Sequence, residues 1–180
     1  MGGVSAKVVL LCEDLQTDVF VRRFLARRNV KSRDIDTCPL PDGGQSGEQW
    51  VRTRFPEELK KIRRRQRALL VVVIDADVGS TGDRHTQLEQ QCREAGVERP
   101  TPEDPVIVAV PRRNIETWFE YLRGKPVDET IAYPRLRREG DCKPFADRLY
   151  AMCNKKQKLD EPAPLSLREV CEERGKLRRI

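Results

Sequence analysis

Residues 68–77, ALLVVVIDAD, decide the fold class of this chain. Its first seven residues are apolar and rich in β-branched side chains, which is typical of a strand buried on both faces of a parallel sheet. Two acids, Asp75 and Asp77, follow at once. Because they stand two positions apart on an extended segment, their side chains should leave the backbone on the same side. The stretch therefore predicts a buried strand that ends in a pair of carboxylates.

Further strands and helices alternate around this stretch. Apolar runs at residues 7–12 (KVVLLC) and 105–110 (PVIVAV) predict two more buried strands, and residues 33–40 predict a weaker one. Such alternation of strands and helices predicts an α/β fold, Rossmann-like, with a mostly parallel sheet flanked by helices. Apolar residues at helical spacing predict helices at residues 16–28, 48–67, 83–95 and 114–122.

The chain is expected to form one main domain with an appendage. Residues 1–125 hold all of the predicted strands, whereas residues 126–180 are polar. Within the second segment, residues 143–152 and 167–177 have helical patterns. We therefore expect a domain at 1–125 and a helical C-terminal extension at 126–180 packed on it.

Composition limits the class of partner. Of 180 residues, 36% are charged and 38% hydrophobic, and the formal net charge is +6. A basic chain favours polyanions, either nucleic acid or an anionic membrane surface. No apolar run approaches the about 20 residues that cross a bilayer, and the first residues lack a secretory signal pattern. We expect a soluble, cytoplasmic protein that does not insert into membranes.

The six cysteines do not form a metal-binding pattern. No pair has C-x-x-C spacing, and the single histidine, His85, has no cysteine at finger spacing. A disulfide framework is not expected in a cytosolic chain of this size, so reduced thiols are predicted.

Acidic residues follow three of the predicted strands. Glu13 follows the first, Asp75 and Asp77 the third, and Glu116 comes soon after the fourth. Ligands of open parallel sheets bind at the carboxyl ends of the strands, so these side chains should converge there. Clustered carboxylates suit Mg²⁺ or Mn²⁺, which prefer oxygen ligands. The alternative is that the acids are loop residues, helix caps or solvated charges; Asp18, in a predicted first helical turn, can be a helix stabiliser.

Three short motifs resemble one protein family. The run CEDLQTD at residues 12–18 resembles the opening motif of Toprim domains in the OLD-nuclease and RloB-like group. VVVIDAD at residues 71–77 is similar to the Toprim D-x-D motif. NIETWFEYL at residues 114–122 resembles the RloB-like segment in which an Asn precedes a Glu and a Trp. One position departs from the pattern, because Asp14 stands where the family usually has Gly.

The resemblance implies a Toprim fold, metal-dependent cleavage of phosphodiesters and a role in prokaryotic defence against foreign nucleic acid. Carried over by position, Glu13 would be a metal ligand or general base, and Asp75 and Asp77 would bind Mg²⁺ or Mn²⁺. Asp18 and Glu116 would help to hold a second ion. The chain has no G-x-x-x-x-G-K-[ST] motif, so an OLD-like ATPase partner would be a separate protein.

Basic residues are candidates for nucleic-acid binding. Arg112 and Arg113 lie between the fourth strand and Glu116, where arginines can hold phosphates bidentately. Lys143 is a weaker candidate, and Arg63 and Arg64 belong to a basic run at residues 60–67. The alternative is that such clusters are solvated helix faces.

The sequence favours a Mg²⁺- or Mn²⁺-dependent nuclease acting on DNA or RNA. A second interpretation is a non-catalytic nucleic-acid-binding or assembly subunit that needs a partner ATPase. A third is a receiver-like signalling domain with Asp75 as phosphoryl acceptor. That domain needs a fifth strand ending in lysine, and no apolar run of that kind is visible.

Overall fold

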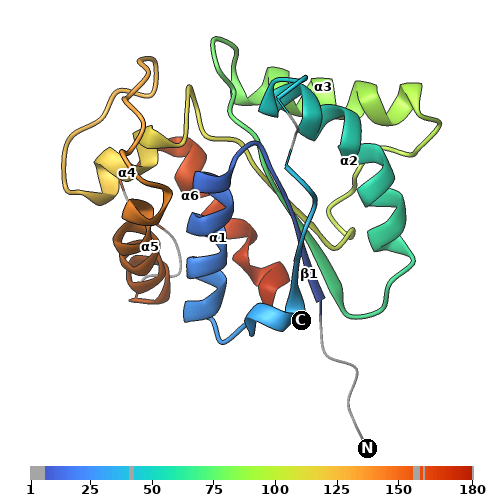
Figure 1. The fold of residues 1–180 in the computed structure, drawn as a ribbon, viewed down its shortest axis with the longest axis horizontal. Helices are drawn as coiled ribbons and strands as arrows, with labels where there is room; N and C mark the ends of the chain where they lie inside the picture. The colour runs from blue at the N-terminus through green and yellow to red at the C-terminus, as the bar shows by residue number, and fades with distance from the viewer. Residues whose placement is uncertain (1–6, 41–42, 156–158, 160, 180) are drawn as a thin grey trace, which may run out of the picture.

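A parallel sheet forms the centre of the molecule (Figure 1). The computed structural model describes residues 7–40, 43–155, 159 and 161–179. Within these residues the sheet has four strands in the order β2-β1-β3-β4, and every pairing is parallel. The predicted α/β class with a parallel sheet is therefore confirmed. The strands are β1 (Lys7–Cys12), β2 (Ile35–Thr37), β3 (Ala68–Val73) and β4 (Val106–Ala109).

The two central strands end at the same level of the sheet. β1 and β3 pair along their whole length, from Lys7 opposite Ala68 to Cys12 opposite Val73. The chain moves outward from β1 to β2 on one side and from β3 to β4 on the other. This reversal of direction between β1 and β3 is the topological switch point at which open α/β sheets bind ligands.

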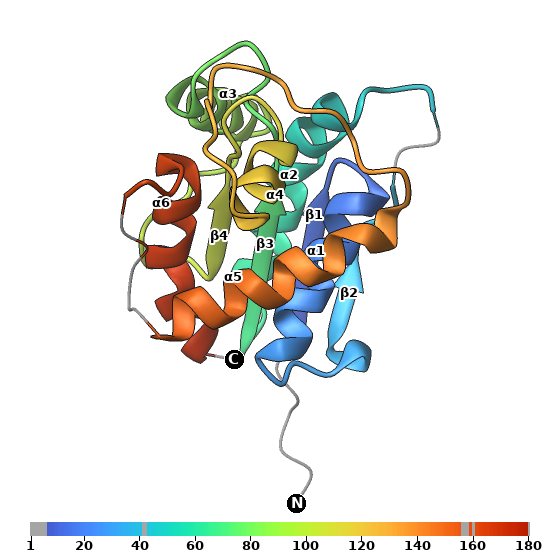
Figure 2. The ribbon, with the colours of Figure 1, turned by 90° about the vertical axis from the view of Figure 1, so that its left-hand side faces the viewer.

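Helices cover both faces of the sheet (Figures 1 and 2). One face carries α1 (Leu15–Arg27), α4 (Glu116–Leu122), α5 (Lys143–Lys155) and α6 (Leu165–Glu173). The other face carries α2 (Gly47–Arg63) and α3 (Thr81–Glu94). Three short 3-10 helices join them: η1 (Ser32–Asp34), η2 (Glu139–Cys142) and η3 (Arg174–Arg179).

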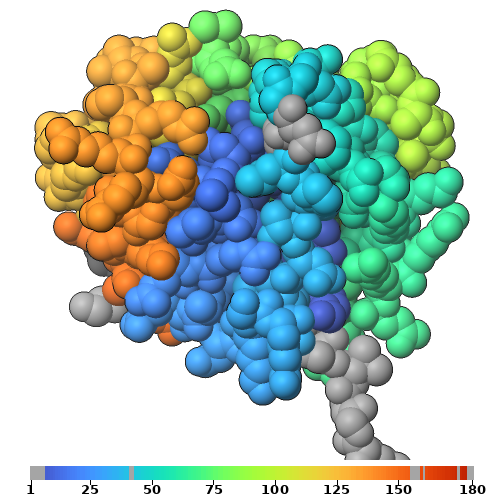
Figure 3. All heavy atoms as spheres, viewed as in Figure 1, coloured from blue at the N-terminus to red at the C-terminus, as the bar shows by residue number. Residues whose placement is uncertain are grey.

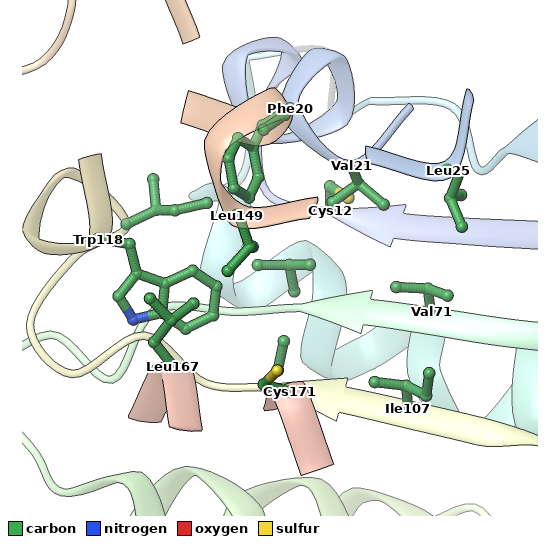
Figure 4. Packing of buried hydrophobic residues seen from close by; sticks show 14 of the residues in the cluster. Cys12, Phe20, Val21, Leu25, Val71, Ile107, Trp118, Leu149, Leu167 and Cys171 are labelled. Atoms are coloured by element: carbon green, nitrogen blue, oxygen red, sulfur yellow. The ribbon is translucent and has the colours of Figure 1, made fainter. Parts of the chain in front are cut away.

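The core has two parts because alternate strand residues point to opposite faces. On the first face Val71 and Ile107 pack with Phe20, Trp118 and Leu149 of the covering helices (Figure 4). On the second face Leu70 and Val72 pack with apolar side chains of α2 and α3. Both faces of β3 are thus buried, as its unbroken apolar run predicts.

Two predicted elements are longer than the observed ones. The helix predicted at 48–67 ends at Arg63, because the chain must turn into β3: Arg67 has φ 49°, and its carbonyl accepts from the Lys7 backbone N–H at 3.0 Å. The strand predicted at 33–40 is reduced to β2, Ile35–Thr37, which is an edge strand of the described sheet and pairs with β1.

The C-terminal segment completes one layer of the molecule. Helices α5 and α6 share a single hydrophobic cluster with the sheet and α1 (Figure 2). The proposed boundary at residue 126 stays a prediction. Among the described residues, no helix combines the length and apolar character that a membrane-spanning segment needs.

The expectation of six reduced thiols is wrong for two of them. Cys153 of α5 and Cys171 of α6 form a disulfide, because the two helices bring their Cα atoms within 6.4 Å. The pair is 18 residues apart in sequence, and nothing in that spacing indicates the proximity. Cys12, Cys38, Cys92 and Cys142 are buried free thiols.

Candidate functional site

Glu13 links the ends of the two central strands. It follows β1, and its Oε1 accepts a hydrogen bond of 2.6 Å from the backbone N–H of Asp75, which follows β3. Burial and, to a lesser extent, the charge of Asp77 raise the pKa of Glu13 to about 7, against the lowering effects of the Asp75 N–H and Arg84. The switch point of the sheet therefore holds a carboxyl group that ionises near neutral pH.

Among the described residues, Asp75 is engaged through its backbone groups but not through its carboxyl group. Its backbone groups are engaged, since the N–H binds Glu13 and the carbonyl accepts from Arg84 Nε at 2.9 Å. Its carboxyl group has no hydrogen-bond or ion-pair partner in the described part of the chain. Burial raises the pKa of Asp75 well above its usual value, and the charges of Glu13 and Glu116 add to the effect. Such a carboxyl group favours a proton or a bound cation.

Arg84 supports this edge from the far face of the sheet. The residue is buried in the first turn of α3, and its guanidinium contacts Glu48 in the first turn of α2. It also donates to Gln87 Oε1 at 2.7 Å and to Asp77 Oδ2 at 3.2 Å. The sequence interpretation missed Arg84 and Glu48. The signal was their position in the first turns of helices that follow strands, which places both at the carboxyl edge of the sheet.

Asp77 does not continue the geometry expected for the D-x-D motif. The segment after β3 is not extended at this residue, because Asp77 has φ 52°. Its backbone N–H donates to the carbonyl of Arg113 at 3.1 Å, and Arg113 has φ 70°. The prediction that the Asp75 and Asp77 side chains leave the backbone on the same side assumed an extended segment, and that assumption is wrong at Asp77. The Asp77 side chain is exposed and bound to Arg84.

Glu116 lies near Asp75 but is already hydrogen-bonded. It occupies the first turn of α4, and its Oε1 accepts from Gln16 Nε2 at 2.7 Å, with both residues buried. Its charge contributes to the raised pKa of Asp75. Gln16 was not singled out from the sequence, although it stands within the EDLQTD run.

Asp18 serves as a link between α1 and β2. Its Oδ2 accepts from Arg22 Nε at 2.9 Å, and its Oδ1 accepts from the Thr37 hydroxyl at 2.7 Å. Because both oxygens are engaged, this arrangement favours the alternative in which Asp18 stabilises its helix. A role for Asp18 in holding a second ion has no support in these contacts.

The predicted nucleic-acid-binding residues fall into two groups. Arg112 is exposed and Arg113 is half-buried in the turn between β4 and α4. Burial raises the pKa of Asp77, and the charge of Arg113 opposes that rise. Lys143 is exposed at the start of α5. Arg63 and Arg64 lie instead at the C-terminal end of α2, at the opposite end of the strands.

Arg113 carries a further unsatisfied group. Its Nε atom is buried and has no hydrogen-bond partner among the described residues. A buried donor without a partner costs stability. The charge of Arg113 acts on Asp77, which places this residue beside the acidic edge.

The residues present fit part of a divalent-metal site. In the described ranges, no three Asp, Glu, His or Cys side chains are placed to hold a metal ion by themselves. Mg²⁺ in nucleotide and polymerase sites commonly takes only one or two carboxylates, with water and substrate phosphates as the remaining ligands. Asp75, with its free carboxyl group, and Glu13 match that smaller requirement.

The site is flanked by segments from distant parts of the sequence. In the space-filling view the β1–α1 junction (blue) lies between the segment that precedes α5 (orange) and the segment that leads into α2 (cyan) (Figure 3). The loop after β3 borders a surface hollow with α2 and α3, whose lining includes Glu48, Asp77 and Arg84. A substrate bound at the switch point would contact these segments.

Comparison of the chain with protein-family models, with curated proteins and with solved structures gives no match.

Proposed function

We propose that this protein is a Mg²⁺- or Mn²⁺-dependent nuclease with a Toprim-like fold. The carboxyl group of Asp75 carries the proposal, because it lies beside Glu13 at the switch point of the sheet and has no partner among the described residues. Burial and the crowding of negative charge raise its pKa, and a divalent cation would relieve that crowding.

Each residue of the site has a role in this proposal. Asp75 and Glu13 would hold the ion, and Arg84 orients Asp75 through its backbone carbonyl. Arg113 would receive a substrate phosphate, with Arg112 beside it. The ion, when bound, would activate water and stabilise the charge that develops on the phosphodiester.

The remaining parts of the proposal rest on the three motifs that resemble the OLD and RloB-like group. They favour a cytoplasmic role in defence against foreign nucleic acid. The net charge of +6 supports a polyanionic substrate, which can be DNA or RNA. A separate ATPase would be the partner in that setting.

A second candidate is a non-catalytic nucleic-acid-binding or assembly subunit that depends on a partner ATPase. The observation that favours it is the engagement of Glu116 by Gln16 and of Asp77 by Arg84. These bonds leave a smaller ligand set than a self-sufficient two-metal site uses. The receiver-like alternative lacks support, because the described residues contain no fifth strand ending in lysine.

Cleavage assays test the proposal. Supercoiled DNA, linear DNA and structured RNA are incubated with Mg²⁺, Mn²⁺ or EDTA and with wild type or Asp75→Asn. We expect metal-dependent cutting of one substrate class and a loss of about 100-fold or more in Asp75→Asn. The matched control is Asp36→Asn, which changes an exposed aspartate on β2.

The assays also separate the two candidates. Cutting by Asp75→Asn at the wild-type rate would contradict the proposed site. Nucleic-acid binding by wild type without cutting in either metal would favour the subunit that needs a partner.

A further inference from the structure

The outer edge of β4 has no neighbouring strand among the described residues; on this edge Val108 is half-buried, whereas Val106 and Val110 are buried. The Leu70 N–H donates to the carbonyl of Pro105 at 2.9 Å, and the Ile74 N–H donates to the carbonyl of Ala109 at 3.1 Å. Because peptide groups alternate in direction along a strand, the N–H and C=O groups of Val106, Val108 and Val110 face away from β3. No other strand of the described sheet lies on that side.

Contacts among the described residues protect this edge at the Val106 end. Val106 is satisfied, since its carbonyl accepts from Lys176 Nζ at 2.8 Å and its N–H donates to Asp104 at 2.8 Å. The backbone groups of Val108 and Val110 that face outward have no protein partner in the part of the chain that the structure describes. Unpaired edge groups of this kind are a template for another strand.

The open edge forms the floor of a groove. Side chains of Val106, Val108 and Val110 line a hollow of about 690 Å³ between α3 and α6. Figure 2 shows α6 beside β4, with α3 beyond the upper end of the strand. An extended peptide is the shape that such a floor and such walls accommodate.

The groove is acidic although the protein is basic. Its lining contains four carboxylates and one lysine, whereas the whole chain has a net charge of +6. An acidic groove repels nucleic acid and attracts a basic peptide. A symmetric pairing of two copies would bring two such acidic grooves together, which like-charge repulsion disfavours. The charged residues of the lining are Glu89, Glu169, Glu172, Glu173 and Lys176.

We infer that this groove binds an extended, basic segment of a partner protein, which adds a strand to β4. Its backbone would pair with the free groups of Val108 and Val110, and its basic side chains would lie near Glu169 and Glu172. The inference is independent of the nuclease proposal, because the groove residues are not those of the carboxyl-edge site.

A labelled short peptide in which lysine and valine alternate tests the inference, by fluorescence anisotropy with the full chain. Val108→Pro removes the outward N–H without touching the bonds to β3, since proline is tolerated on edge strands. We expect wild type to bind the peptide and Val108→Pro to weaken binding by about tenfold. Val108→Thr keeps the N–H and the shape, so it should bind as wild type does.

Charge reversal provides a second variant that leaves the strand unchanged. Glu169→Lys with Glu172→Lys should weaken the lysine peptide and favour a matched glutamate–valine peptide, whereas Glu139→Lys, outside the groove, should do neither. Equal affinity of wild type and Val108→Pro would overturn the inference, and so would equal affinity for the two peptides. A wild-type dimer that Val108→Pro dissociates in sedimentation would also overturn it, because the edge would then belong to a second copy.

Discussion

Charged side chains at the two ends of the central sheet have opposite effects on the stability of the native state. At the amino end, Arg63 binds Asp104 through two contacts, of 2.7 Å (Nη2 to Oδ2) and 2.9 Å (Nε to Oδ1), and its guanidinium lowers the pKa of Asp104. At the carboxyl end, the carboxyl group of Asp75 has no partner in the part of the chain that the structure describes, and burial and neighbouring charge raise its pKa. The first arrangement stabilises the native state, whereas the second destabilises it. Unfavourable charge at one edge of a fold is typical of a site kept for a ligand.

The largest expected difference between the two ends of the sheet is the pH dependence of stability that the carboxyl end produces. The pKa of Glu13 is about 7 in the native state against 4.5 for an ordinary glutamate. Between these values the native state holds a proton that the unfolded state has lost, so stability falls as pH rises through the interval. We expect metal-free protein to lose about 3 kcal/mol of unfolding free energy from Glu13 alone, at about 1.4 kcal/mol per pKa unit. Asp75 acts in the same direction.

Urea unfolding in EDTA across this interval measures the loss. Millimolar Mg²⁺ should restore stability at the upper end of the interval and have little effect at the lower end, where protons occupy the carboxyl groups. Stability that rises with pH through the interval would contradict the assignment of a raised pKa to Glu13.

Removal of the Glu13 charge should abolish much of this loss. Glu13→Gln keeps an oxygen that can accept from the Asp75 N–H and carries no charge, so we expect it to be about 2 to 3 kcal/mol more stable than wild type above neutral pH in EDTA. The same variant should lose activity, which separates stability from function. Glu139→Gln, on an exposed glutamate, is the control and should leave stability unchanged. Destabilisation by Glu13→Gln would mean that the carboxylate is a net favourable group.

At the amino end of the sheet, removal of a charged side chain should lower the unfolding free energy instead of raising it. Arg63→Ala leaves Asp104 mostly buried and without its cation, so we expect a loss of about 2 kcal/mol of unfolding free energy. Arg65→Ala, on an exposed neighbour, should change little. Nucleic-acid binding should survive in Arg63→Ala, because Arg63 also donates to the carbonyls of Glu98 and Arg99 and is a structural residue here. Selective loss of that binding, with stability unchanged, would restore the earlier interpretation of Arg63.

The elements that could be predicted are those fixed by local pattern. The apolar run of β3 required a buried strand, and the rule for parallel sheets then brought its end close to the end of β1, as the contact between Glu13 and Asp75 shows. The partners of the acids could not be predicted in the same way. Arg84 meets Glu48, and Thr37 meets Asp18, only because helices and strands far apart in sequence pack together.

Backbone conformation explains the error at Asp77. The D-x-D pattern assumes an extended chain, whereas Asp77 is left-handed and its N–H donates to the carbonyl of Arg113 in the turn after β4. Non-glycine residues rarely adopt this conformation, so no sequence pattern indicates it.

Binding of Mn²⁺ tests the central claim most directly, because it requires neither the substrate nor a partner. Electron paramagnetic resonance of free Mn²⁺, titrated with protein above neutral pH, measures the bound fraction. We predict saturable binding by wild type that Mg²⁺ displaces, loss of that binding in Asp75→Asn, and its retention in Asp36→Asn. Equal binding by wild type and Asp75→Asn, or none by wild type even with nucleic acid present, would contradict the account.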